Sequence, residues 1–190
     1  MNQVALCVGH SRTVGNTIEG GATAWDNHEN EWHFNCRLVA LVQAELKQHK
    51  IASVIYSLYR GATYFEAQKW LAEQIKQSDC NSAIEFHFNS AGPLAHGHEV
   101  LCWHNSVKGL KLAKIEEEEL KHHFNTPARG VKQITSKSER GAPFLYLTHC
   151  PAIILEPFFG SSQEDWKAVA EKEVTLAEVI AGGIEVYYNA

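Results

Sequence analysis

Short apolar runs alternate with longer amphipathic stretches along the chain, and this alternation predicts an α/β fold. The run from Val4 to Val8 is apolar and only five residues long, as in a buried strand. After Glu31, apolar side chains recur at a spacing near 3.6 residues, which predicts an amphipathic helix. We expect strands over residues 3–9, 52–58, 82–88, 97–103, 131–135 and 152–156, and helices over 31–48, 63–78, 105–124 and 163–188.

Two local signals add to this outline. Ser161 and Glu164 have the spacing of a capping box, which predicts that the last helix begins directly after the segment that carries Glu156. Residues 15–30 contain Gly20 and Gly21 among small polar residues, and we expect a surface loop there. In open α/β sheets such a loop lies beyond the carboxyl ends of the strands, where active sites form.

Composition limits the classes of protein that the chain can belong to. With 190 residues, 45% hydrophobic and 21% charged, it fits one globular domain over residues 1–190. No run approaches the roughly 18 apolar residues of a membrane segment. The net charge of −5 argues against a nucleic acid partner. Five scattered cysteines without a Cys-x-x-Cys pair, and no basic leader, favour synthesis in the cytoplasm without a signal peptide.

Candidate chemistry lies at the ends of the expected strands. His10 follows the first strand, and His87 lies near the end of the third with Glu85 and Asn89 on the same face. An imidazole with an amide two residues on suits a metal ligand with an outer partner. Glu156 ends a buried strand, so we expect a raised pKa, which suits a general base near neutral pH.

Two imidazoles and one carboxylate form a site that leaves the fourth zinc position open for water. Both Glu29 and Glu31 are near enough to the first helix to supply the carboxylate. Glu31 begins that helix, where the helix dipole favours a negative charge. Taken alone, each candidate also has an ordinary structural explanation, such as a helix cap, an ion pair or a core histidine.

Other polar clusters carry less chemical meaning. His28 and His33 are five residues apart, so on a helix they would diverge by about 140°, and we treat both as surface residues. His96 and His98 alternate on a strand and are weaker metal candidates. The acidic run over residues 116–119 is expected to be a solvated helix face.

The ordered set of segments resembles the zinc-dependent N-acetylmuramoyl-L-alanine amidases of the Amidase_3 type. The glycine-rich continuation that this family has after its first Gly-His is replaced here by residues 11–14. The resemblance covers nearly the whole chain. It rests on Gly9-His10, on Glu31 four residues before Asn35, on His87-Phe-Asn89, on Gly97-His-Glu-Val100 and on Glu156-Pro-Phe-Phe159.

The resemblance implies that His10, Glu31 and His87 bind Zn²⁺ and that Glu156 is the catalytic base. It selects Glu31 over Glu29 because the family glutamate lies four residues before an asparagine. It also implies cleavage of the amide that joins N-acetylmuramic acid to L-alanine in peptidoglycan. The implied fold is a twisted mixed sheet of about six strands flanked by helices, of the phosphorylase/hydrolase-like kind.

Further expectations concern the substrate and the setting. Arg129, before Gly130 in an expected loop, is a candidate for holding a substrate carboxylate, and Asn89 for the outer partner of His87. Peptidoglycan is the expected partner of a monomeric enzyme. Because peptidoglycan lies outside the cytosol, a phage endolysin that reaches the wall at lysis is favoured over a removed leader or delivery by a tail or secretion machine.

Two alternatives remain at this stage. One is a related zinc carboxypeptidase or amidohydrolase, and a carboxypeptidase needs an arginine clamp for a terminal carboxylate. The other is a non-catalytic cell-wall-binding module. No recognisable clamp motif surrounds any of the five arginines, Arg12, Arg37, Arg60, Arg129 and Arg140.

Overall fold

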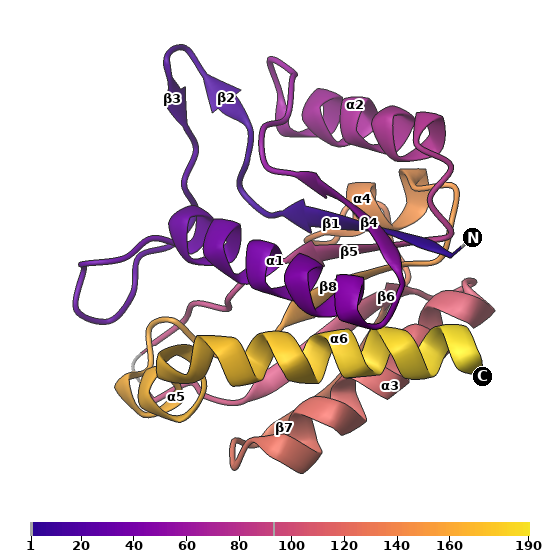
Figure 1. The fold of residues 1–190 in the computed structure, drawn as a ribbon. Helices are drawn as coiled ribbons and strands as arrows, with labels where there is room; N and C mark the ends of the chain where they lie inside the picture. The colour runs from indigo at the N-terminus through magenta and orange to yellow at the C-terminus, as the bar shows by residue number, and fades with distance from the viewer. Residues whose placement is uncertain (1, 93) are drawn as a thin grey trace.

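One mixed sheet organises the molecule in the computed structural model, which describes residues 2–92 and 94–190. Its strand order is β4-β1-β5-β8-β6-β7 (Figure 1). The first four of these strands run parallel, β6 is antiparallel to β8, and β7 is parallel to β6. The expected six-stranded mixed sheet is therefore confirmed. The strands are β1 (Gln3–Val8), β4 (Ala52–Tyr56), β5 (Ser82–Phe86), β6 (His98–Trp103), β7 (Ala128–Ile134) and β8 (Ala152–Glu156).

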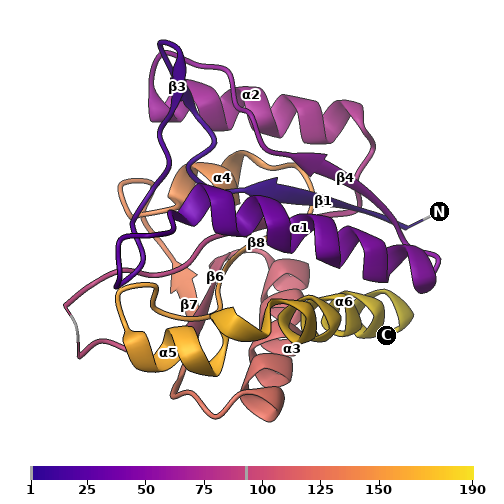
Figure 2. The ribbon, with the colours of Figure 1, turned by 60° about the vertical axis from the view of Figure 1, so that its left-hand side comes forward.

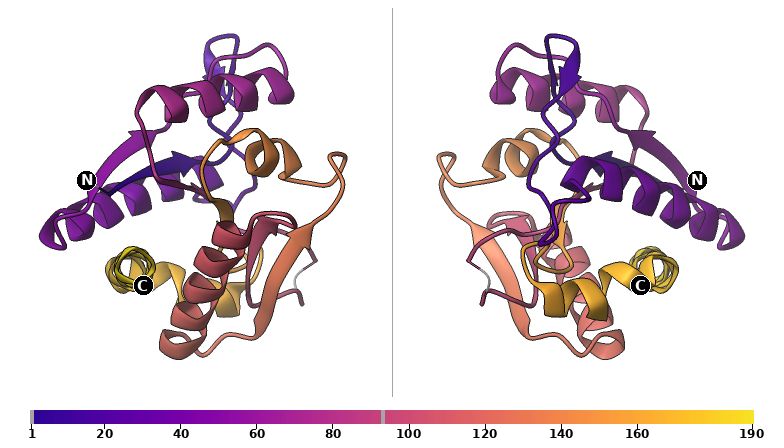
Figure 3. Two further views of the ribbon diagram at one scale, coloured as in Figure 1. Left: turned by 90° about the vertical axis from the view of Figure 1, so that its right-hand side faces the viewer. Right: turned by 90° about the vertical axis from the view of Figure 1, so that its left-hand side faces the viewer.

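Helices cover both faces of this sheet, as the views in Figures 2 and 3 show. One face packs against α1 (Glu31–Gln48), α3 (Val107–His123) and α6 (Glu173–Asn189). The other packs against α2 (Tyr64–Gln77) and the short α4 (Ala142–Leu147). None of the helices within the described residues is both long and apolar enough to span a membrane.

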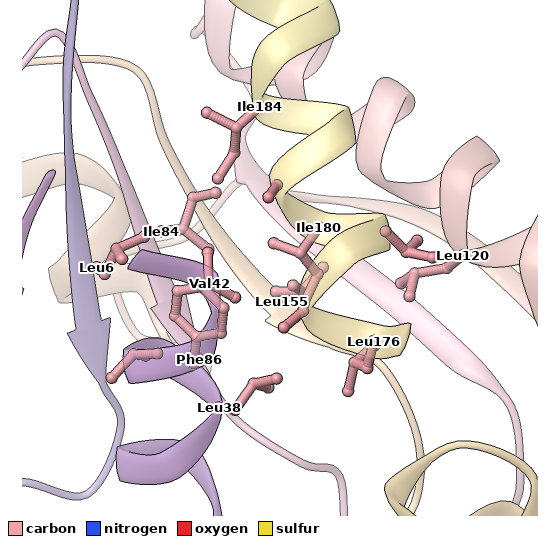
Figure 4. Packing of buried hydrophobic residues seen from close by; sticks show 14 of the residues in the cluster. Leu6, Leu38, Val42, Ile84, Phe86, Leu120, Leu155, Leu176, Ile180 and Ile184 are labelled. Atoms are coloured by element: carbon pink, nitrogen blue, oxygen red, sulfur yellow. The ribbon is translucent and has the colours of Figure 1, made fainter. Parts of the chain in front are cut away.

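Side-chain alternation along the strands produces the two cores. On β1, Leu6 belongs to the core under α1 and α6, whereas its neighbours Ala5 and Cys7 belong to the core under α2 and α4. Apolar runs without alternation fit strands that are buried on both faces. Figure 4 shows the first core, where strand residues meet α1, α3 and α6; it labels Leu6, Leu38, Val42, Ile84, Phe86, Leu120, Leu155, Leu176, Ile180 and Ile184.

The expected last helix over residues 163–188 is wrong as a single element. The chain forms α5 (Gln163–Ala168), a 3₁₀ turn η1 (Ala170–Lys172) and then α6. The capping box at Ser161 is also wrong, because Ser162 caps α5 and its hydroxyl accepts from the backbone N–H of Asp165. The break has a packing reason: Val169 is fully buried with a non-helical backbone, so the chain turns before α6 begins.

Four smaller differences also separate the expectation from the structure. Part of the expected loop is a two-stranded hairpin, β2 (Thr13–Val14) and β3 (Thr17–Ile18), and α4 was not expected. Arg129 lies inside β7 rather than in a loop, because that strand begins three residues before the expected one. Glu116 was expected to be solvated, but it is fully buried where α3 packs on α6.

Candidate active site

Three parallel neighbours, β1, β5 and β8, bring their carboxyl ends to the same edge of the sheet. His10 lies two residues after β1, His87 directly follows β5, and Glu156 is the last residue of β8. Glu31 is the first residue of α1, whose N-cap Asn30 accepts a hydrogen bond from a backbone N–H of the first turn. Four side chains that are distant in sequence therefore meet at one edge.

His10, Glu31 and His87 form a compact cluster. One ligand atom from each lies within 4.8 Å of the others. The Nδ1 atom of His87 is 2.8 Å from Oε1 of Glu31, and Nε2 of His10 is 3.3 Å from Oε2. Backbone N–H groups of Ala22 and Phe88 donate to the two Glu31 oxygens, which holds that carboxylate in place.

The contacts within the cluster shift the pKa values of Glu31 and His87 in opposite directions. Burial works against the charged form of Glu31, yet its contacts with His87 and His10 bring the pKa of that carboxyl below its usual value. Burial likewise opposes the charged ring of His87, but hydrogen bonds to Glu31 and Glu85 raise its pKa well above the ordinary value. Each of the two groups therefore favours the charged form of the other.

Two glycines leave the space that the cluster needs. A Cβ atom on Gly9 would lie 2.2 Å from Cε1 of His87. A Cβ atom on Gly21 would lie 2.6 Å from Oε2 of Glu31 and 2.7 Å from Cδ2 of His10, and Gly21 has a positive φ of 73°. Any side chain at these positions would displace the cluster, because such contacts are far shorter than van der Waals distance.

The donor set of this cluster fits a zinc ion. Two imidazoles and one carboxylate are borderline and hard donors that zinc accepts readily, and three protein ligands are typical of sites where zinc acts in catalysis. Gly9 and Gly21 leave room for the three donor side chains, where any Cβ atom would collide with them. The residues present could therefore hold Zn²⁺ without additional protein ligands.

Glu156 is a buried carboxylate with one engaged and one unengaged oxygen. Its Oε1 accepts from Nη2 of Arg140 at 2.7 Å. Within the described residues its Oε2 is buried without a hydrogen-bond partner. Burial raises the pKa of Glu156 to about 7, although His87 and Arg140 pull it in the opposite direction. The raised pKa is the one expected for a carboxyl at the end of a buried strand.

A cavity of about 460 Å³ opens over these residues. His10, Glu31, His87 and Glu156 line it, together with Arg140. A second hollow, of about 640 Å³, shares Arg140 with the first and is lined largely by residues from β6 and β7. Arg140 therefore lines both hollows, as do Leu101 and Glu139.

The structure places Arg129 and Asn89 in a neighbouring network. Arg129 donates from Nε to Glu99 at 2.9 Å, and its guanidinium lies 5.0 Å from the ring centre of Phe159. Asn89 donates its amide to the other Glu99 oxygen at 2.8 Å rather than facing His87. Both residues line the second hollow. Because β6 runs antiparallel to β8, the start of β6 brings Glu99 opposite Glu156.

Sequence reasoning gave no role to two residues that contact the site. Glu85 accepts from Nε2 of His87, and its position two residues earlier on the same strand face could have identified it. Arg140 lies in the loop before α4, and no spacing rule in the sequence connects it to Glu156. Its place depends on Gly141, whose Cβ would lie 2.3 Å from Ile154 on β8.

Other candidates lie elsewhere. Glu29 pairs with Arg37 at 2.7 Å and is not among the three clustered donors. His98 is buried, with Nδ1 3.0 Å from the hydroxyl of Thr126, and burial lowers its pKa to about 4.

An α/β sheet that gathers carboxylates and imidazoles at its strand ends, beside a cavity, has the features of an active site in an α/β enzyme. Residues 4–186 match the N-acetylmuramoyl-L-alanine amidase family, Amidase_3. The chain belongs to this family, whose members act on peptidoglycan and are generally zinc-dependent. This family match supports an amidase rather than a carboxypeptidase or a non-catalytic wall-binding module.

Solved structures share the fold. The catalytic domain of CwlV, an amidase from Bacillus (Paenibacillus) polymyxa var. colistinus, is 22% identical with a TM-score of 0.79, covering 100% of this chain and 99% of that one. The catalytic domain of an endolysin targeting Clostridia difficile is 22% identical with a TM-score of 0.78, covering 97% of each. The amidase AmiC2 of Nostoc punctiforme is 21% identical with a TM-score of 0.79, covering 100% and 98%. No curated protein sequence matches the chain.

Proposed function

We propose that the protein hydrolyses the amide between N-acetylmuramic acid and L-alanine. In this proposal His10, Glu31 and His87 hold a zinc ion, and Glu156 is the general base. One observation carries this proposal: three donor atoms lie within 4.8 Å of one another in the cavity that Glu156 also lines. A bound zinc ion would supply a Lewis acid that acidifies water and polarises the amide carbonyl.

The role of Glu156 follows from its surroundings. Its buried Oε2 has no partner within the described residues and so is free to accept a proton from the attacking water. A pKa of about 7 leaves much of the carboxyl deprotonated at neutral pH, while the protonated form is still acidic enough to return the proton to the leaving nitrogen. A carboxyl at its ordinary pKa would hold that proton less well.

Arg140 orients this base. Its bond to Oε1 fixes the carboxylate plane, while its side chain keeps 62% of its surface exposed in the cavity. An exposed guanidinium also suits a carboxylate of the peptide that begins with the leaving L-alanine. We therefore assign to Arg140 the substrate contact that the sequence assigned to Arg129, which is bound to Glu99 in the second hollow.

Digestion of purified sacculi tests the function and the base together. The parent protein should release new alanine amino termini without new reducing sugars. Glu156→Gln should keep its metal content and lose about 10² to 10⁴ of kcat/KM, because the proton acceptor is gone and the shape is kept. Glu164→Gln, at an exposed position in α5, is the matched control and should keep full activity. An active Glu156→Gln protein with its zinc would contradict the assignment of the base.

We further propose one catalytic domain that works as a monomer. The family match spans residues 4–186, and one chain supplies all the proposed site residues. We also propose synthesis in the cytoplasm and action on the cell wall at lysis, as an endolysin does. The five cysteines, which are free thiols, support a reducing site of synthesis. Light scattering of the purified protein tests the monomer.

A further inference from the structure

Behind the proposed zinc ligand His87 lies a second carboxylate, Glu85, that no sequence expectation assigned. Glu85 is on β5 and its side chain is only 1% exposed. Its Oε2 is 3.1 Å from Nε2 of His87. The opposite ring nitrogen, Nδ1, faces Glu31 in the cluster. His87 therefore lies between two carboxylates, one on each side of its ring.

Helix α2, which packs on the face of the sheet opposite α1, holds Glu85 in place. Gln68, on α2, donates from Nε2 to Oε1 of Glu85 at 2.9 Å, and Gln68 is itself buried. The hydroxyl of Tyr59 approaches the same oxygen at 3.5 Å. A buried carboxylate is costly unless its oxygens are satisfied, and here each oxygen has a partner. The carboxylate is therefore held with one oxygen directed at the imidazole.

The contact between Glu85 and Nε2 of His87 constrains where the ring carries its proton. A carboxylate only accepts, so Nε2 of His87 must carry a proton wherever Glu85 is ionised. In the neutral ring, Nδ1 is then the atom with the free lone pair, and Nδ1 is the atom that faces Glu31. With a cation on Nδ1, the ring would keep its single proton on Nε2, where Glu85 accepts it, and this contact fixes the orientation of the ring towards the cluster.

We propose that Glu85 is a positioning residue for metal binding, which acts through His87 and is held in turn by Gln68. The proposal rests on the zinc centre proposed above. A carboxylate that accepts from the far nitrogen of a ligating histidine fixes the ring and makes it a stronger donor, and its loss typically weakens metal affinity 10- to 100-fold. Glu85 itself is not among the three clustered donors, so its effect passes through the ring.

Zinc affinity measured by competition with a chromogenic chelator tests this role. Glu85→Gln should bind zinc about 10- to 100-fold more weakly than the parent. Gln68→Met, which removes the donor that holds Glu85 and leaves His87 intact, should weaken binding in the same direction by a smaller factor. Glu116→Gln is the matched control, because Glu116 is equally buried but lies between α3 and α6. Its zinc affinity should stay within about twofold of the parent.

The melting temperature of each metal-free variant separates positioning from folding. A purely structural Glu85 would lower that temperature and leave the zinc dissociation constant of the folded protein unchanged, which would overturn the proposal. If Glu85→Gln does not fold, Gln68→Met decides, and an unchanged affinity there overturns it as well. A parent protein that binds no zinc removes the zinc centre and this role together. A parent with one tight zinc and unaffected variants removes only the role of Glu85.

Discussion

At the scale of single residues, the ion pair between Arg140 and Glu156 sets the pH at which the proposed base is ready to act. The guanidinium favours the ionised carboxylate and so opposes the effect of burial on its pKa. A general base must be deprotonated, so activity falls as pH falls through this pKa. A bound cation would lower the same pKa, which puts the acid limb of the parent at or below about pH 7.

Arg140→Gln should move that acid limb to higher pH by about 0.5 to 1 unit, because the carboxylate loses its cationic partner while burial remains. The measurement is kcat/KM against pH on solubilised peptidoglycan. Lys137→Gln is the control: Lys137 lines the same cavity, but its ammonium lies over the ring of Tyr146, so the limb should not move. A limb that stays in place or moves to lower pH in Arg140→Gln would contradict the proposed orientation of the base.

The residues at strand ends could be predicted from sequence to different degrees. His10, His87 and Glu156 each follow or end an apolar run, which places them at the sheet edge on pattern alone. The choice of Glu31 over Glu29 needed the family resemblance, because both flank the start of α1. Arg140 could not be found, since its contact with Glu156 depends on the path of a loop that no periodicity describes.

At the scale of elements, the contact between α3 and α6 contains a buried acid. Both carboxyl oxygens of Glu116 lack a partner among the described residues. They occupy the space left by Gly183, where a Cβ atom would lie 2.7 to 2.9 Å from the carboxyl group. Burial raises the pKa of Glu116 well above its ordinary value of 4.5. Between the unfolded and the folded pKa values, the folded protein therefore binds a proton that the unfolded chain releases.

This contact should make the protein less stable as pH rises. A raised folded-state pKa gives its full contribution below about pH 4.5, and that contribution is lost as pH climbs towards the folded value. Glu116→Met should remove this loss and stabilise the protein at pH 8 by about 1 to 3 kcal/mol. Urea unfolding at pH 5 and pH 8 measures the difference. An equal pH dependence in both proteins would show that Glu116 is not its source.

Element prediction succeeded where the pattern and the packing agree. Apolar runs marked the four central strands, β1, β5, β6 and β8, because these strands are buried. The edge strands β4 and β7 are less buried, and the expected start of β7 was three residues late. The acidic run in α3 was misjudged, since four consecutive glutamates cover every side of a helix and one of them must face inward. The break before α6 was missed because residues 168–173 contain neither glycine nor proline to mark it, and only the buried position of Val169 reveals the turn.

At the scale of the whole molecule, the proposed zinc ion would connect three separate elements. Its ligands come from the loop after β1, the first turn of α1 and the residue after β5. Zinc at about 100 times its dissociation constant should add about 2.7 kcal/mol to stability, or about 5 to 10 °C in Tm. Thermal melts with and without a chelator measure this shift. Chelation should also abolish activity, and added zinc should restore it.

His87→Ala is the control for that experiment, because it removes one donor and should show no stabilisation by zinc. A parent protein with the same Tm in zinc and in chelator would contradict the metal site.

Fold class was predictable at this scale, because the alternation of strands and helices runs through the whole chain. The reversal of β6 and β7 was not predictable, since apolar patterning does not encode strand direction.

The position of β8 also bears on how the protein is made. Although β8 is the last strand to leave the ribosome, it lies between β5 and β6 in the finished sheet. A nascent chain that has emerged only through β7 therefore has two strand groups, β4-β1-β5 and β6-β7, with no partner to join them. The same strand ends in Glu156, so the segment that closes the sheet also delivers the proposed base. Translation must therefore pass β8 before the proposed base can join the metal-binding cluster.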